Sequence, residues 1–428
     1  MIRSDSNVPE EPLALVSGWR RRTFVSLTDR NYRAYFLGSA VSVSGTWMQR
    51  VAQDWLVLQL THSGVALGVS SALQFAPVLF LGAWGGAVID RVDRRRLLLL
   101  TQVLSALLAA VLGLVTATGL VTLWLVYALT LGLGVVTVFD SPARQTFVAE
   151  MVGTEKVINA QSLYSTVHNG GRLVGPALAG IVIAWLGVAA AFGINALSFV
   201  AMIAALAWMD VGALQRVPPT PRAPRQIRDG LGYVWGHREL RASLLLVAVV
   251  GVFGQNFRVV LPLLAQDTYR GGAQSYGYLT AALGLGAVIG ALGSAARSRS
   301  SLRGMLLTCL AFGGVNLLVA VMPSFVLALA AIVGVGVTNI IFNTVARTLM
   351  IIASDPSMRG RVMAIYNIVF LGSTPIGGPI VGWACQAWGA RSGFVIAGVT
   401  AAGAAAVMVV TARGSVPWRR GDATPADH

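Results

Sequence analysis

Long uninterrupted runs of apolar residues dominate this chain of 428 residues. Four of these runs are Leu97–Val115, Val121–Val138, Gly187–Trp208 and Gly393–Val410. A run of about 18 or more apolar residues is typical of a membrane-spanning helix, because about 20 helical residues cross the hydrocarbon core. The runs do not alternate apolar and polar positions as the strands of a membrane barrel do. The pattern therefore predicts an all-α integral membrane protein that crosses the lipid bilayer many times.

The same pattern predicts twelve transmembrane helices. Their ranges are 34–60, 64–89, 97–118, 122–147, 159–185, 187–209, 242–266, 275–296, 303–321, 325–348, 361–386 and 391–412. Composition supports a membrane location, since the mean hydropathy is +0.70 and only 11% of the residues are charged. In soluble domains, roughly a quarter of all residues are charged.

The basic residues lie mainly in alternate loops. If the N-terminus is cytoplasmic, 27 of the 32 Lys and Arg residues lie in tails, loops or span ends on the cytoplasmic side. Arg270 and Arg391 fall outside, and Arg50, Arg172 and Arg258 lie deeper within spans. This asymmetry follows the positive-inside rule and predicts a cell-membrane protein with both termini cytoplasmic. It argues against nucleic acid as a partner, because a binder would gather its net charge of +15 on one soluble face.

The longest loop separates two halves of about equal length. With a shift of 203 residues, "FDSPAR" at 139–144 falls on "FNTVAR" at 342–347. Parallel six-helix halves are a transporter architecture in which the substrate binds between the halves, near the midplane. We therefore expect two pseudo-symmetric six-helix bundles and these parts: a cytoplasmic tail 1–33, an N-terminal bundle 34–209, a cytoplasmic linker 210–241, a C-terminal bundle 242–412 and a cytoplasmic tail 413–428.

The sequence indicates a secondary transporter rather than an enzyme or an ATP-driven pump within one chain. A Walker A loop ends in Gly-Lys-Ser/Thr, where the lysine and backbone amides hold phosphates. The only lysine is Lys156, in "GTEKVIN", which is not that motif. We expect no cofactor and no metal, with an ion gradient as the energy source and a monomer as the working unit.

The loop between spans two and three carries a family motif. "GAVIDRVDRRRLL" at 86–98 resembles the signature of the major facilitator superfamily, Gly-x-x-x-Asp-Arg-x-Gly-Arg-Arg, although Asp93 stands where the family has glycine. The matching residues are Gly86, Asp90, Arg91, Arg94 and Arg95. The resemblance implies a cytoplasmic latch that forms when the carrier opens outward. It also implies a relay of Asp90 and Arg94 with an acid at the end of span four, here Asp140.

Span five carries a second family motif. "GRLVGPALAG" at 171–180 resembles the superfamily's antiporter motif, with Ala179 in place of one glycine. The residues concerned are Gly171, Gly175, Pro176 and Gly180, with Gly378 and Pro379 as their counterparts in the second half. The resemblance implies a hinge on which the halves rock, although small residues also serve simple helix packing. "GTWMQRVAQDWLVLQLT" at 45–61 and "NFRVVLPLLA" at 256–265 resemble the enterobactin-exporter-like branch of the superfamily.

Ionisable residues inside spans are expensive to bury and point to function. Arg50 and Asp54 are four residues apart and share one helix face. Arg172 follows His168 by one turn in span five. The shifts of 202 and 203 residues that relate the halves set Asp54 against Asn256 and Asp140 against Asn343. The first half therefore keeps the titratable acids. The proton-coupling candidates are Asp54, Arg50, Asp140, Arg172 and His168; alternatively, Asp54 simply pairs with Arg50.

The expected substrate cavity combines aromatic and amide side chains. The candidates are Trp47, Gln53, Trp55, Gln74, Phe75, Tyr127, Gln255, Asn256, Phe257, Arg258, Asn316, Asn339 and Asn343. Such a lining suits small amphipathic organic molecules, and we expect a proton-coupled exporter of drugs, secondary metabolites or siderophores. The arginines within spans favour an anionic substrate instead. An importer of a nutrient or lysophospholipid, or a membrane sensor without transport, are the alternatives.

Overall fold

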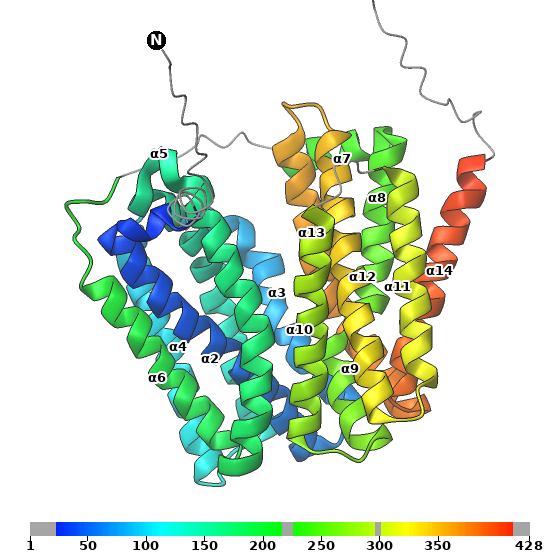
Figure 1. Cartoon of the computed structure of the whole chain (residues 1–428), viewed down its shortest axis with the longest axis horizontal. Coiled ribbons are helices and arrows are strands. Elements are labelled where there is room, and N and C mark those ends of the chain that lie inside the picture. Colours follow the sequence, from blue (N-terminus) through cyan, green and yellow to red (C-terminus); the bar gives the residue numbers. More distant parts are fainter. Residues whose placement is uncertain (1–22, 216–225, 296–300, 414–428) are drawn as a thin grey trace, which may run out of the picture.

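The computed structural model describes residues 23–215, 226–295 and 301–413, and the elements assigned there are helices. The first bundle contains the short helix η1 (Val25–Thr28) and α2 (Arg30–Thr61), α3 (Gly64–Ile89), α4 (Arg94–Ala117), α5 (Leu123–Leu186) and α6 (Val188–Ala207). The second contains α8 (Arg238–Val249), η2 (Val250–Gly254), α9 (Phe257–Leu263), η3 (Leu264–Thr268), α10 (Ala273–Ala295), α11 (Leu302–Val321), α12 (Phe325–Ile352), α13 (Arg359–Trp388) and α14 (Arg391–Arg413). Figure 1 shows the two bundles side by side.

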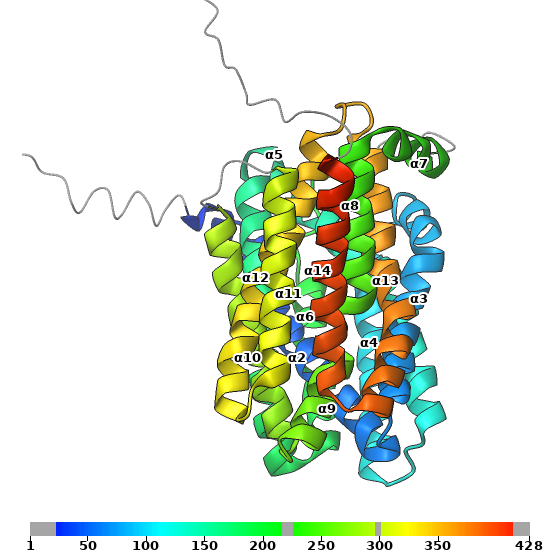
Figure 2. The same cartoon turned by 90° about the vertical axis from the view of Figure 1, so that its right-hand side faces the viewer.

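The described chain begins and ends on one side of the molecule, which we call the terminal side, and the opposite side is the far side (Figure 1). Helix α7 (Gln226–Gly236) lies across the terminal side of the second bundle (Figure 2). Tyr233 of α7 donates a hydrogen bond to Asp355, 2.9 Å away. Parts of the expected tails and linker, residues 1–22, 216–225 and 414–428, lie outside the described residues.

Ten helical segments among the described residues are long and apolar enough to cross a membrane. One of them is α5, with 64 residues, which bends at Gly153 where φ is +72°. Glycine adopts such a left-handed conformation without a steric penalty, and the chain reverses direction there. Helix α2 is 32 residues long but more polar than the others. The all-α membrane fold is therefore confirmed, while the count of twelve spans stays a prediction.

The seventh expected span is not one regular helix. Helix α8 passes into the π-helical segment η2, and the helix is then interrupted at Gln255 and Asn256 before α9 begins. A second π-helical segment, η3, completes the span. π-Helical segments occur often at functional sites, and an irregular backbone within a membrane is tolerated where protein or a cavity surrounds it. The interruption places two amide side chains between the bundles.

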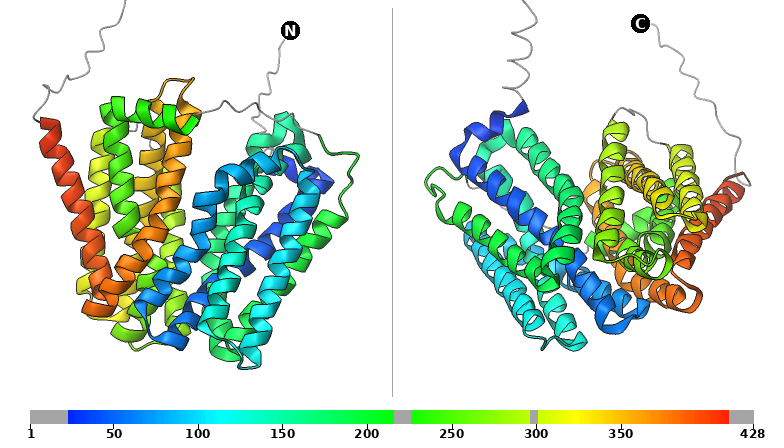
Figure 3. Two further views of the ribbon diagram at one scale, coloured as in Figure 1. Left: turned by 180° about the vertical axis from the view of Figure 1, so that it is seen from behind. Right: turned by 60° about the horizontal axis from the view of Figure 1, so that its bottom comes forward.

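The two bundles meet along two glycine-lined seams. In one, α3 packs on α13, and a Cβ atom on Gly378 would lie 2.9 Å from the carbonyl oxygen of Gly68. In the other, α5 packs on α10, and a Cβ on Gly277 would lie 2.7 Å from the carbonyl oxygen of Pro176. Small residues allow such close backbone approach. The seams run from the middle of the molecule to the far side, and the bundles diverge toward the terminal side (Figures 1 and 3).

Candidate functional site

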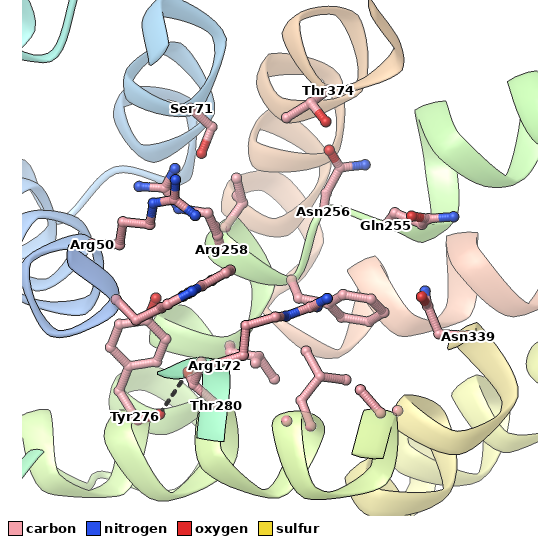
Figure 4. A pocket seen from close by; sticks show the side chains of 18 of the residues that line it. Arg50, Ser71, Arg172, Gln255, Asn256, Arg258, Tyr276, Thr280, Asn339 and Thr374 are labelled. Atoms are coloured by element: carbon pink, nitrogen blue, oxygen red, sulfur yellow. Dashed lines mark hydrogen bonds between the residues drawn. The ribbon is translucent and has the colours of Figure 1, made fainter. Parts of the chain in front are cut away.

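A cavity of about 180 Å³ lies between the two bundles (Figure 4). Helices α2, α3 and α5 contribute to it from the first bundle, and α9, α10, α12 and α13 from the second. Its polar and aromatic lining is Trp47, Arg50, Ser71, Phe75, Arg172, Gln255, Asn256, Phe257, Arg258, Tyr276, Thr280, Asn339 and Thr374. Within the described parts of the chain, no three His, Cys, Asp or Glu side chains gather as a metal site would require.

An ion pair crosses from one bundle to the other beside this cavity. Arg258 Nε donates to Asp54 Oδ2 over 2.9 Å, and Arg258 Nη2 donates to Asp54 Oδ1 over 2.6 Å. The Tyr276 hydroxyl also donates to Asp54 Oδ2, over 2.9 Å. The side chain of Asp54 is only 1% exposed. Bidentate, charge-assisted hydrogen bonds of this kind are among the strong ones in proteins. We call Asp54, Arg258 and Tyr276 the clasp, because they join α2 to α9 and α10.

The clasp is supported by neighbouring side chains. Arg258 Nη1 donates to Gln74 Oε1 of α3 over 2.5 Å. The indole of Trp55 stacks on the ring of Tyr276, with centroids 6.4 Å apart and 23° between the planes. Gln53 donates to the Ser70 hydroxyl over 3.2 Å. The contacts of Gln74 and Trp55 support Arg258 and Tyr276 directly, whereas that of Gln53 joins α2 to α3 within the first bundle.

Arg50 is not the main partner of Asp54. Although the two residues share a helix face, the Arg50 guanidinium lies over the ring of Trp47, 4.5 Å from its centroid. Arg172 approaches the same ring at 5.3 Å. The fork of Arg258 occupies both carboxylate oxygens, so the pairing of Asp54 with Arg50 that the spacing suggested is replaced by a pairing across the bundles.

Amide side chains are one part of what the second bundle contributes to the cavity. Gln255 donates to Asn343 Oδ1 over 3.2 Å, and Asn343 donates to Asn339 Oδ1 over 2.9 Å. Asn256 donates to the carbonyl oxygen of Val252 over 2.6 Å. Figure 4 shows Gln255, Asn256 and Asn339 facing the same space as Arg172. The cavity therefore combines cationic side chains with uncharged amides.

A second cavity, of about 210 Å³, lies within the first bundle and shares Trp47 and Arg50 with the first. Asp140 faces it and accepts hydrogen bonds from Thr101 at 2.8 Å, Gln102 at 2.6 Å and Arg144 Nε at 2.7 Å. His168 also lines it, with Nδ1 3.1 Å from its own helix's carbonyl oxygen at position 164. Asp140 is thus bound within its own bundle.

The latch residues make contacts within the first bundle. Arg94 pairs with Glu150, and Arg95 donates to the carbonyl oxygens of Leu206 and Ala207 over 2.7 and 2.9 Å. Asp93 caps α4 by accepting from the backbone N–H of Arg96 over 2.9 Å, which explains how an acid serves where the family has glycine. The expected relay from Arg94 to Asp140 is absent from these described contacts, because Arg94 and Asp140 each bind another partner.

The remaining latch residues lie at the turn between α3 and α4. Asp90 is the C-terminal cap of α3 and its backbone N–H donates to the carbonyl oxygen of Gly86 over 3.4 Å. Arg91 is exposed. Glu150 was not identified from the sequence, since no spacing rule connects it with Arg94, 56 residues away.

The expected hinge residues divide between two roles. Gly171 and Gly175 face Val43 and Trp47 of α2 within the first bundle. The others border the seams between the bundles: a Cβ on Gly180 would lie 3.0 Å from the Cα atom of Gln274 in α10, and Pro176, Gly378 and Pro379 are also seam residues.

Six expected cavity residues are not part of the lining of the cavity between the bundles. Gln53 and Gln74 line the second cavity instead, and Asn343 is hydrogen-bonded to Gln255 and Asn339. The other three are Trp55, Tyr127 and Asn316. Trp55 is 7% exposed and packs on the clasp. The hydroxyl of Tyr127 donates to the carbonyl oxygen of Ala66 over 3.0 Å, and Asn316, fully buried, donates to that of Phe312 over 2.7 Å. The Tyr127 hydroxyl and the Asn316 amide nitrogen are thus bound to backbone, whereas Asn316 Oδ1 has no hydrogen-bond partner within the described residues. Conversely, Tyr276 and Thr280 line the cavity although no charge or repeat in their surroundings indicated it.

Comparison with known proteins identifies membrane transporters as relatives of this chain. A family model described as transmembrane secretion effector matches residues 21–428. The multidrug efflux pump Tap of Mycolicibacterium fortuitum is 31% identical over 372 residues, covering 82% of this chain and 88% of Tap. The enterobactin exporter EntS of Shigella boydii is 26% identical over 373 residues, covering 85% and 87%. The staphyloferrin A transporter of Staphylococcus aureus is 25% identical over 262 residues, covering 60% and 65%.

Solved structures share the fold. The nucleoside transporter NupG superimposes with a TM-score of 0.74 at 11% identity, over 90% of this chain and 99% of NupG. A bacterial homologue of the human lysosomal transporter Spinster, in an inward-facing and occupied conformation, gives a TM-score of 0.69 at 14% identity, over 92% and 98%. At these identities the likeness shows the fold alone.

Proposed function

Because this chain belongs to the transmembrane secretion effector family of major facilitator transporters, we propose that it is a proton-coupled exporter of small amphipathic organic molecules. It is a multi-pass membrane protein and not an enzyme. The names of Tap and EntS, an efflux pump and an exporter, favour outward transport. The cavity between the bundles offers an aromatic and amide lining of the kind that small-molecule sites use.

The distribution of basic residues supports a cytoplasmic terminal side. Arg91, Arg95 and Arg303 lie there on exposed or partly exposed helix ends, as the positive-inside rule expects. With this orientation, the glycine seams and the clasp close the extracellular side, and the bundles diverge toward the cytoplasm. The conformation is then inward-facing, ready to accept a substrate from the cytoplasm.

The observation that carries the coupling proposal is the ion pair between Asp54 and Arg258. Opening the extracellular side must separate α2 from α9, and it would leave a carboxylate in a membrane cavity without its partner. A charge without a partner in such a cavity is unfavourable. Asp54, which the extracellular solution can then reach, therefore takes up a proton from outside. Because the protonated acid carries no charge, its attraction to Arg258 is weaker. When the carrier turns inward, Asp54 releases the proton to the cytoplasm and the clasp forms again.

The latch acts in the opposite state under this proposal. Its charged residues lie on the cytoplasmic side and now bind within the first bundle. In the outward-facing state, the two bundles approach each other at this side, and Asp90 and Arg94 become available to the second bundle. The clasp and the latch would then stabilise the two states in turn.

Transport in everted membrane vesicles tests the proposal. The vesicles are energised with an inward-acid pH gradient and offered two fluorescent dyes, the cation ethidium and the anion fluorescein. An exporter concentrates at least one dye inside the vesicles, and collapse of the pH gradient stops the uptake. Efflux of preloaded dye instead of uptake would indicate an importer, and no protein-dependent movement of either dye would contradict the proposed function.

A further inference from the structure

The cavity carries more positive charge than its acidic neighbours balance. Arg50, Arg172 and Arg258 line it together, and Figure 4 shows the three side chains around the same pocket. Both oxygens of Asp54 are occupied by Arg258. Among the residues that the structure describes, no carboxylate forms an ion pair with Arg50 or Arg172. Two guanidinium groups therefore face the cavity without a paired anion.

The two guanidinium groups both lie against one aromatic ring. Arg50 and Arg172 lie 4.5 and 5.3 Å from the centroid of Trp47. Contact with an indole face offsets part of the cost of burying a cation. It does not remove the repulsion between two like charges, and it supplies no hydrogen-bond acceptor. Arg50 Nε is buried and has no hydrogen-bond partner within the described residues.

These observations define what would complete the site. An anion between Arg50 and Arg172 would accept hydrogen bonds from both guanidinium groups and neutralise their charge, which is worth most in a poorly hydrated cavity. A cation at the same place would add a third positive charge. A site of this kind therefore favours an anion over a cation.

We propose that Arg50 and Arg172, together with Trp47 that both contact, form a binding subsite for the acidic group of an organic anion. The aromatic or apolar body of the ligand rests against Phe75 and Phe257, which line the same cavity. The amides of Gln255, Asn256 and Asn339, which also line the cavity, bind its uncharged polar groups. The role of this subsite in transport rests on the proposed function, and it narrows the substrate class from amphipathic molecules in general to aromatic organic acids.

Binding to the purified full-length protein in a neutral detergent tests the subsite without any pH gradient. The probes are pairs of nearly isosteric molecules that differ in charge: benzoate and benzamide, and salicylate and salicylamide. Binding to the folded state raises the unfolding temperature, and the concentration dependence of this rise gives an apparent affinity. We expect at least one acid to bind more tightly than its amide. Arg50→Gln and Arg172→Gln should each weaken binding of that acid about tenfold or more and leave the amide unaffected.

Two control variants separate the subsite from a general charge effect. Arg303→Gln removes a positive charge from an exposed position of α11 and should leave the preference for the acid intact. Arg50→Lys keeps the charge but not the planar fork, and it should restore part of the affinity lost in Arg50→Gln. Unfolding temperatures without ligand show whether each variant folds.

The outcomes are distinct from those of the transport test, because binding in detergent depends on neither direction nor coupling. Equal stabilisation by acid and amide, no stabilisation by either acid, or a preference retained in both Arg→Gln variants would overturn the subsite and leave the exporter proposal standing. Added phosphatidylglycerol micelles provide one more arm. Arginine-dependent stabilisation by this anionic lipid, with none by the aromatic acids, would also overturn the proposal.

Discussion

Two of the Asp–Arg pairs among the described residues, both largely shielded from solvent, differ in what they connect. Asp140 and Arg144 lie four residues apart on α5, with Nε and Oδ2 2.7 Å apart. Asp54 and Arg258 are 204 residues apart in sequence and join the two bundles. The first pair remains intact when the bundles move as rigid bodies, whereas the second must break. Similar chemistry therefore stabilises a bundle in one place and a conformational state in the other.

The largest expected effect comes from removing the acid of the pair between the bundles. Asp54→Asn keeps a hydrogen-bond acceptor but fixes the neutral form, so concentrative transport driven by a pH gradient should be lost while downhill flux persists. Proteoliposomes loaded with the dye that wild type transports measure both quantities. Asp140→Asn is the matched control and should retain coupling. If Asp54→Asn still concentrates the dye and Asp140→Asn does not, the roles of the two acids are reversed.

The pair within the bundle should matter more for folding. Arg144→Gln leaves Asp140 partly buried without its cation, and breaking a buried pair in this way costs about 3–5 kcal/mol. We expect a marked fall in the unfolding temperature of the purified protein. Arg258→Gln should cost less stability, because the bundles can separate and let water reach Asp54. An equal or larger fall for Arg258→Gln would show that the clasp is mainly structural.

A smaller effect is expected at the seam beside the clasp. Gly277→Ala places a Cβ 2.7 Å from the carbonyl oxygen of Pro176, and overpacking of this kind costs about 1–3 kcal/mol. The inward-facing state should lose population, measured as faster cysteine labelling of far-side positions. Gly293→Ala on the same helix has open space around its Cβ and serves as the control. Unchanged labelling in Gly277→Ala would exclude the seam as a determinant of closure.

The smallest effect on the accessibility of the two sides is expected at the latch in the present state. Arg94→Gln removes the pair with Glu150, a contact within one bundle whose side chains are 11% and 10% exposed. Its loss lowers the stability of that bundle by about 3–5 kcal/mol but does not bear on which side of the carrier is open. Resting accessibility should change little, whereas the outward-facing state induced by Asp54→Asn should be destabilised. Cysteine labelling of Arg94→Gln reports the resting state, and labelling of the double variant Asp54→Asn/Arg94→Gln reports the outward-facing state. A large change in Arg94→Gln alone would mean that the latch already bridges the bundles.

The sequence predicted the membrane fold well, because hydrophobic length alone identifies helices that cross a bilayer. It also placed Asp54, Arg172 and Arg258 among the important residues, since buried charge is rare in membranes. The partner of Asp54 was not predictable from helix spacing, which favoured Arg50. The pairing depends on how two bundles pack, and local periodicity carries no information about that.

Two further features needed the structure. The interruption of the seventh span at Gln255 and Asn256 lies within an apolar segment without proline at that point, so hydropathy gave no sign of it. Tyr276 reads as one aromatic residue among many, yet its hydroxyl is the third donor to Asp54. Both features depend on how the helices pack against one another. The helix propensity and hydropathy of a single segment do not reveal them.

The distance across the far side, measured as a function of the charge on Asp54, tests most directly whether the ionised acid holds the two bundles together. Spin labels at Thr118 of the first bundle and Ser324 of the second, in a variant lacking Cys309 and Cys385, report this distance by double electron–electron resonance. We expect a short distance in wild type at neutral pH, a shift to longer distances in Asp54→Asn, and a wild-type distribution in Asp140→Asn. A far side that stays closed in Asp54→Asn would contradict the claim that the ionised Asp54 holds the two bundles together.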